Sequence, residues 1–275
     1  MHTTRNKLFF FGSTLAAGLC SLGLHRYMMD SFLDSKGLLI SGNLPGRLLI
    51  LVGLLFAGAL LWKLRGLGGD GTYADNFPKN TASGLLMIAA GVVLAAAAPG
   101  LMQPAAPGAE LVAWARLFEQ LTDAAMTALP WLAAVSMAVL GLFRMKGRKP
   151  APWFSGVVCL FYMMLLVTNY RLWSADPQLQ DYAYQLLAGV LLMLCSFHRT
   201  CCDAGVIQRK KLLATGLGAA VCCMASLSGD FQWGFYLASG LWAAGSMCHV
   251  AVLPPDPEED EEEPEPESEI KEETE

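Results

Sequence analysis

The chain has 275 residues, of which 54% are hydrophobic and 16% are charged, and its formal net charge is −5. The apolar residues gather into eight stretches free of Asp, Glu, Lys and Arg. The connections between them have at most about 20 residues, which excludes a soluble globular domain. The net charge is uneven, because residues 254–275 contain 13 of the 24 acidic residues and one of the 19 basic residues, which leaves +7 for the rest.

A bilayer core of about 30 Å requires about 20 helical residues, or about 17 when flanking side chains reach the head groups. Most stretches meet this length, and the second is short and relies on Arg47 and Lys63. We predict an all-α integral membrane bundle of about eight transmembrane helices over residues 1–253, followed by a disordered acidic cytoplasmic tail over 254–275. The stretches are 8–24, 48–62, 83–102, 125–143, 154–170, 182–198, 212–229 and 234–253.

The first stretch allows two interpretations. Arg5 and Lys7 before an apolar run are also typical of a secretory signal peptide, whose cleavage would leave seven spans. Leu19, directly before Cys20, is the wrong residue for a lipoprotein cleavage site, which requires a small one. We predict that the first stretch is retained as a transmembrane helix.

Lys and Arg are retained on the cytoplasmic side of membrane proteins, so their distribution predicts orientation. With the N-terminus inside, the inner segments hold 13 basic residues and the outer loops hold five, apart from the tail. The chain is therefore predicted to be N-in and C-in, with an even number of spans. Stretches one and two loosely parallel stretches five and six, which allows a four-plus-four repeat.

Several local features predict how the bundle packs. Pro130 is expected to kink the fourth stretch, and Pro99 to end the third. The segment 111–123 is amphipathic at helical spacing and predicts a helix on the outer surface, or an extension of the fourth span. Small residues four apart predict that the last two helices pack together, at Ala214 and Gly218, Gly216 and Ala220, Ser239 and Ala243, and Gly240 and Ala244.

The outer connection between stretches five and six is the most distinctive local sequence. Asp176 before Pro177 predicts a helix start, and Trp173 with nearby tyrosines lies at interface depth, so membrane anchoring explains most of it. The remaining polar residues are a candidate outward cluster facing a pocket. They are Asn169, Arg171, Asp176, Asp181 and Gln185.

The run from Trp173 to Tyr182, the Gln185 to Ala188 segment and an expected turn from His198 to Gly205 resemble uncharacterised multi-pass membrane proteins of anaerobic Gram-positive bacteria. The resemblance covers roughly residues 150–250. It implies a bacterial cytoplasmic membrane, with no activity or site residue attached.

Cysteine and histidine gather at the inner ends of stretches six and eight. Soft thiolates with imidazoles suit zinc or copper, which makes this a candidate metal site. Alternatively, cysteine fills gaps in an apolar core and histidine lies among head groups, and no pair has a standard zinc spacing. We predict no cofactor. The residues are Cys195, His198, Cys201, Cys202, Cys248 and His249.

The sequence contains no phosphate loop, zinc-protease motif or nucleophile elbow, and no carboxylate pair within a stretch, so an enzyme is not favoured. The leading prediction is a non-enzymatic scaffold or partner-binding membrane protein, and the alternative is a small-solute or ion transporter. A membrane enzyme would require one of the two clusters to converge. Besides the lipid bilayer, the predicted partners are anionic lipids or a basic cytoplasmic protein at the tail, and no nucleic acid.

Overall fold

The computed structural model describes residues 2–32, 43–67, 71–101, 113–173, 179–228, 232–247 and 250. All regular secondary structure in these residues is helical, which confirms the all-α prediction. The helices are α1 (His2–Ser31), α2 (Leu44–Arg65), α3 (Tyr73–Asn76), α4 (Thr81–Leu101), α5 (Ala113–Lys146), α6 (Pro152–Trp173), α7 (Leu179–Ala204), α8 (Arg209–Ser226) and α9 (Trp233–Met247).

Six helices have the length and apolar composition to cross a membrane, namely α1, α2, α4, α5, α6 and α7. In lipid every backbone polar group must be paired, and a helix pairs them within the segment. Each of the eight predicted stretches overlaps one long helix. However, α8 with 18 residues and α9 with 15 are not among the six.

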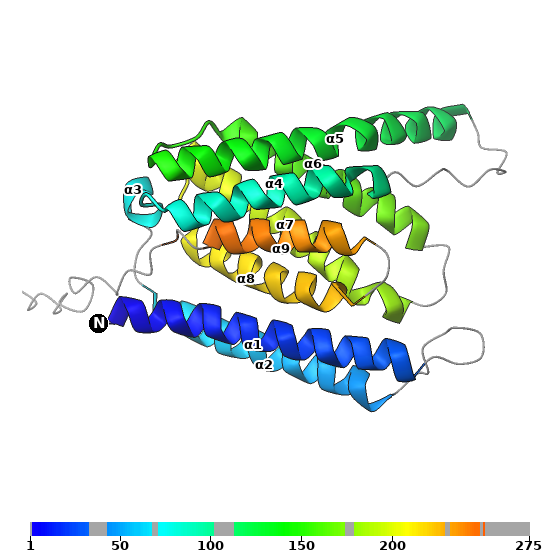
Figure 1. The fold of residues 1–275 in the computed structure, drawn as a ribbon, viewed down its shortest axis with the longest axis horizontal. Coiled ribbons are helices and arrows are strands. Elements are labelled where there is room, and N and C mark those ends of the chain that lie inside the picture. The colour runs from blue at the N-terminus through cyan, green and yellow to red at the C-terminus, as the bar shows by residue number, and fades with distance from the viewer. Residues whose placement is uncertain are drawn as a thin grey trace, which may run out of the picture.

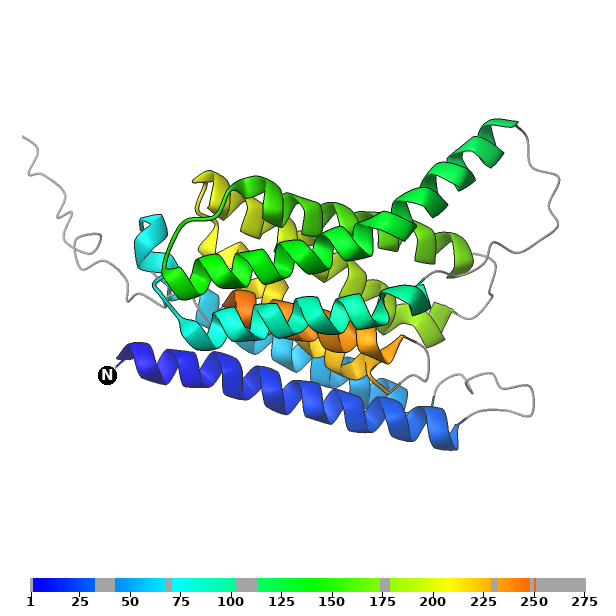
Figure 2. The ribbon, with the colours of Figure 1, turned by 45° about the horizontal axis from the view of Figure 1, so that its top comes forward.

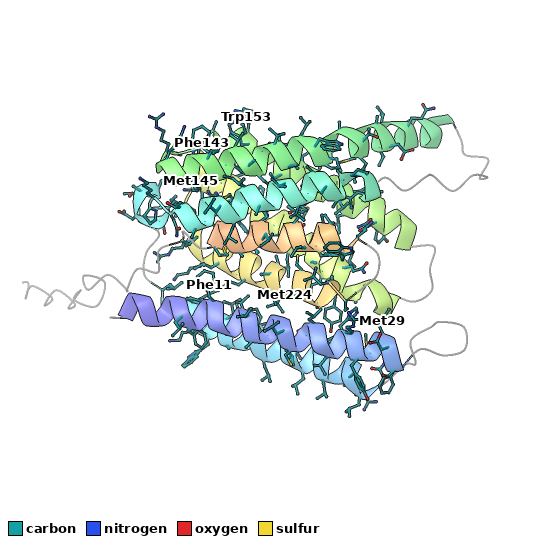
Figure 3. All side chains as sticks on the ribbon, in the orientation of Figure 1. Phe11, Met29, Phe143, Met145, Trp153 and Met224 are labelled. Carbon is teal, nitrogen blue, oxygen red and sulfur yellow. The ribbon has the colours of Figure 1, made fainter. Side chains whose placement is uncertain are left out.

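The long helices form two groups (Figure 1). Helices α4 to α9 form a body, in which α4 contacts α5 and α9, and α7 contacts α6 and α8. Helices α1 and α2 lie together along one side of this body, where α1 contacts α8. Met224 of α8, labelled in Figure 3, lies against Gly18 of α1. We call these groups the α1–α2 pair and the α4–α9 body.

Helices α4 and α5 approach closely because small residues line their contact. A Cβ placed on Gly84 would lie 2.6 Å from the carbonyl oxygen of Gly141, and one on Gly91 would lie 2.5 Å from that of Ala134. Membrane helices associate through such close packing, since lipid tails are as apolar as the side chains. Backbone against backbone therefore sets the distance between these two helices.

The predicted packing of the last two helices is confirmed. A Cβ on Gly216 of α8 would lie 2.6 Å from the side chain of Met247 in α9. Helix α9 also packs on α4, where the Ser83 hydroxyl donates to the carbonyl oxygen of Gly245 at 2.9 Å. The short α9 is thus held from two sides.

The predictions for the two prolines and for the amphipathic segment can be compared with helices α4 and α5. Pro99 lies two residues before the end of α4, as predicted, and Pro130 lies within α5. Figure 2 shows α5 bending away from the body in its N-terminal part, which agrees with the expected kink. The prediction of a separate surface helix at 111–123 is wrong, because from Ala113 onward this segment is the beginning of α5.

The C-terminal part of α7 also differs from expectation. The segment from His198 to Gly205, expected as a turn, is helical as far as Ala204. The turn lies at Gly205, whose φ of +107° is in the region that glycine adopts without strain. Helix α7 therefore continues past residue 198 and includes Arg199 and Asp203.

Candidate functional site

The predicted outward cluster lies only partly within the described residues. Asn169 is buried near the end of α6, and Gln185 is half-buried in α7. Arg171 and Asp181 belong to α6 and α7, but their side chains lie outside the described part, as does the whole of Asp176. The convergence of these five residues stays a prediction.

The predicted metal cluster is likewise incomplete. Cys195, His198, Cys201 and Cys202 follow one another along α7, whereas Cys248 and His249 lie outside the described residues. Nδ1 of His198 is 2.8 Å from Oε1 of Gln208, and Cys195 and Cys202 pack in an apolar cluster. Among the side chains that the structure describes, no three His, Cys, Asp or Glu are placed to hold a metal. The metal site also stays a prediction.

A different set of charged side chains meets where α5 and α7 end. Arg144, Arg199 and Asp203 are 2%, 0% and 0% exposed. Nε of Arg199 is 3.2 Å from each carboxylate oxygen of Asp203, and Nη2 of Arg144 is 3.6 Å from Oδ1. Arg199 and Asp203 are one turn apart on α7, so this helix forms its own pair, whereas Arg144 reaches the carboxylate from α5. We call these three residues the buried ion cluster.

Two aromatic rings at α3 cover the buried ion cluster. The Tyr73 hydroxyl donates to Oδ1 of Asp203 at 3.1 Å. The guanidinium carbons of Arg144 and Arg199 each lie 4.5 Å from the centroid of the Phe77 ring. These distances are typical of cation–π contacts, in which the face of an aromatic ring attracts a cation. The Phe77 ring therefore helps to hold both guanidinium groups in place.

The local electrostatics of α3 keep these contacts in place. Thr72 and Asp75 form a capping box at the start of the helix, and its hydrogen bonds lower the pKa of Asp75. Burial raises the pKa of Tyr73, and the hydrogen bond to Asp203 acts in the same direction, so the hydroxyl keeps the proton it donates. Nζ of Lys149 lies 5.3 Å from the centroid of the Tyr73 ring and adds a third cation.

The buried ion cluster contains more donors than acceptors. Among the described residues, Nε and Nη2 of Arg144 and both terminal nitrogens of Arg199 are buried without a hydrogen-bond partner. In the part of the chain that the structure describes, one carboxylate, that of Asp203, serves two guanidinium groups and one hydroxyl. A buried donor left unpaired costs about 1–3 kcal/mol, and more when it is charged. The site is therefore both positively charged and short of acceptors.

The surrounding segments add to this positive charge. Residues 63–79, 144–149 and 199–211 hold 11 basic and three acidic residues. Helix α8 begins with Arg209, Lys210 and Lys211, with no acidic residue in its first turn and no side-chain cap from Gln208. The N-terminus of a helix already carries partial positive charge. Cations at this position add to that partial charge, so the start of α8 favours an anion.

Large side chains fill the middle of the α4–α9 body, and the polar groups of Trp242 and Tyr162 are paired. Trp242 and Tyr162 are fully buried. Nε1 of Trp242 donates to the Ser196 hydroxyl at 3.3 Å, and the hydroxyls of Tyr162 and Ser239 are 3.2 Å apart. Buried polar groups with partners need no water. These hydrogen bonds join α7 to α9 and α6 to α9.

Two grooves in the described part lie between helices at the edge of the bundle. One of about 510 Å³ lies between α2, α7 and α8, with Leu54, Leu187 and Val221 in its lining. One of about 360 Å³ lies between α4 and α9, beside Val93 and Trp233. No charged side chain lines either groove.

The sequence analysis missed the buried ion cluster because the predicted stretches ended at residues 143 and 198. Arg144 and Arg199 were consequently counted as loop charges. The available signals were pairs of residues four apart, Arg199 with Asp203 and Tyr73 with Phe77. Such pairs also occur on solvated helices, so the spacing alone does not indicate burial.

A scan against protein-family models, a search of curated proteins and a search of solved structures each found no match to this chain. The six apolar helices define it as a multi-pass membrane protein. At one end of its bundle is a buried cluster of two arginines and an aspartate. The family resemblance of residues 150–250 stays a prediction.

Proposed function

We propose that this chain is a non-enzymatic scaffold of a bacterial cytoplasmic membrane, which works by binding partners at its cytoplasmic face. The filled middle of the α4–α9 body is the observation that supports this most. Trp242 and Tyr162 occupy it, and their polar groups are paired with neighbouring helices. Basic residues gather at the end that holds α3, where residues 63–79, 144–149 and 199–211 hold 11 basic and three acidic residues.

The proposal includes eight spans with both termini inside. Helix α8 contacts α1, α7 and α9, and α9 contacts α4 and α8, so both lie among the six apolar helices. The basic residues of the loops favour the cytoplasm for the end that holds α3. Impermeant thiol labelling of single cysteines, placed in turn at residues 36, 148 and 206, tests this. Labelling from outside is expected at residue 36 alone, and outside labelling at 148 would overturn the orientation.

The acidic tail at 254–275 is the proposed binding element on the same face. Its charge of −12 suits a basic cytoplasmic protein, or the basic segments of this chain itself in competition with anionic lipid. We favour the basic partner, because a disordered charged segment binds without a preformed surface. A shortened chain lacking residues 255–275 separates the two. If the tail folds back, its deletion increases binding to anionic vesicles at low salt.

The function is tested by comparing transport with partner binding. In proteoliposomes, osmotic swelling with ions, sugars and amino acids should be no faster than in empty liposomes. In cells, crosslinking should capture a basic protein with the full chain and lose it when residues 255–275 are deleted. Rapid solute flux would support the transporter alternative and overturn the scaffold. Equal capture with and without the tail would overturn the role of the tail.

A further inference from the structure

We propose that the buried ion cluster, together with Tyr73 and Phe77, is a binding site for a phosphate group, carried by a lipid head group or by a small soluble molecule. The site lies at the end of α5 and α7, where α3 covers it (Figure 1). The inference stands whether or not the acidic tail binds a protein, because none of its residues belongs to the tail.

Charge is the first argument for an anion. Arg144 and Arg199 bring two positive charges, and Asp203 returns one negative charge. Lys149, whose Nζ lies over the Tyr73 ring, is exposed, so the buried excess of these side chains is one positive charge. Buried charges must be paired, because removing an ion from water costs several kcal/mol. A group with one negative charge would balance the site.

Unpaired donors are the second and independent argument. Within the described part of the chain, both terminal nitrogens of Arg199, with Nε and Nη2 of Arg144, are buried without a hydrogen-bond partner. Arginine binds phosphate through two parallel N–H groups, which match the spacing of phosphate oxygens. Several oxygens on one small group can accept from both arginines at once. A neutral ligand would leave the charge unbalanced.

Preorganisation is the third argument. The Phe77 ring lies 4.5 Å from both guanidinium carbons. The Phe77 ring has no acceptor oxygen or nitrogen, so these contacts leave the oxygen acceptors that the N–H groups need to another partner. Arg199 is also fixed through Nε by Asp203, which keeps its terminal nitrogens for another partner. The arginines are thus already oriented, and binding costs little side-chain entropy.

Inorganic phosphate is the first probe. Its binding to the purified full chain in uncharged detergent is measured by calorimetry, with chloride at equal ionic strength as the salt control. Arg199→Gln should weaken binding at least about tenfold, the loss expected for one charge-assisted hydrogen bond. Arg26→Gln is the matched control, because Arg26 also pairs with a carboxylate four residues on, at 3.7 Å, but is exposed. It should leave phosphate affinity unchanged.

Asp203→Asn is a second variant with the opposite expected effect, measured on the folded protein because the variant is itself expected to be less stable. Removing the carboxylate that competes for both arginines should tighten phosphate binding at least about threefold, by relief of like-charge repulsion. General damage to the fold would weaken binding instead. Phosphate should also raise the melting temperature of Asp203→Asn more than that of the unchanged chain. Weaker binding by folded Asp203→Asn would overturn the proposal.

The second probe distinguishes the two sources of phosphate. The chain is placed in phosphatidylcholine nanodiscs without free phosphate. In one set about one lipid in five is phosphatidic acid, which is enough to saturate a specific site, and the other set contains none. Stabilisation by phosphatidic acid that Arg199→Gln abolishes identifies a lipid head group. Stabilisation by inorganic phosphate alone identifies a soluble ligand. No arginine-dependent effect of either probe would show that water satisfies the buried donors, and would overturn the site.

Discussion

The α1–α2 pair and the α4–α9 body differ in what covers their apolar surfaces. In α2, Ile50, Leu54 and Leu55 are 60%, 66% and 64% exposed, and four of its 22 residues are buried. In α8, twelve of 18 residues are buried, although this helix begins with three cations. Of these two helices, α2 has the composition of a membrane span, and it is the less buried one.

This difference shows what hydropathy measures in such a chain. Leucine-rich surfaces face lipid, which solvates them as well as protein does. Helices that pack against protein on several sides instead carry small residues, as α8 does at Gly216 and Ala219. The body should therefore respond strongly to changes in packing and charge, and the α1–α2 pair weakly.

The largest difference is expected between two aspartates that each pair with an arginine four residues away. Asp203 is fully buried, so Asp203→Asn leaves two guanidinium groups without a counter-charge. In phosphate-free buffer we expect a loss of about 3–5 kcal/mol in the free energy of unfolding. Asp30 pairs with Arg26 on α1 with both side chains exposed, so Asp30→Asn should cost less than about 1 kcal/mol.

Thermal or detergent denaturation of the two variants measures this difference. Equal losses would contradict the view that the buried ion cluster is desolvated and that the pair on α1 is not.

Two glycines provide the next comparison. A Cβ on Gly91 of α4 would lie 2.5 Å from the carbonyl oxygen of Ala134, so Gly91→Leu must separate α4 from α5. We expect a loss of at least about 1–3 kcal/mol from overpacking. A Cβ on Gly58 of α2 meets nothing within 4 Å, so Gly58→Leu should be neutral or slightly stabilising. The midpoint of unfolding in detergent measures both, and a destabilised Gly58→Leu would show that α2 faces protein.

The sequence predicted the helices well because apolar stretches between basic loops have one stable form in lipid. All eight predicted stretches overlap a helix, and Gly216 lies against Met247 where the spacing of small residues predicted contact between the last two helices. The sequence did not predict that α4 packs on α5 through Gly84 and Gly91. Small residues indicate a packing face, but they do not identify the helix that lies opposite.

The buried ion cluster was harder to predict, for a physical reason. In the sequence, Arg144 and Arg199 follow apolar stretches in the same way as any basic residue of a cytoplasmic loop. Their burial depends on a long-range contact, since Arg144 and Asp203 are 59 residues apart, and on α3 placing Tyr73 and Phe77 over them. Periodicity describes one segment at a time and cannot show that two segment ends meet.

A smaller effect is expected where the α1–α2 pair is attached to the body. Nδ1 of His25 in α1 pairs with the hydroxyl of Ser228, and its ring lies edge-on to Tyr184 of α7. His25→Ala should cost about 1–2 kcal/mol and expose α1 to hydrogen exchange while the body keeps its protection. Ser13→Ala is the control on the same helix, because that hydroxyl bonds only within α1. Loss of protection throughout the body would contradict a separable pair.

The smallest effect appears only at alkaline pH. Burial raises the pKa of Tyr73, so above about pH 10 the unfolded chain releases this proton while the folded chain keeps it. The free energy of unfolding should then fall as pH rises, by up to about 1.4 kcal/mol per pH unit, with no contribution at pH 8. Tyr73→Phe should remove this part of the slope, although it also loses the hydrogen bond to Asp203 at every pH.

Tyr27→Phe, which removes an exposed tyrosine of α1, should keep the full slope in melting curves from pH 8 to 11. If both variants keep the slope, Tyr73 ionises freely and α3 does not shield the buried ion cluster from water.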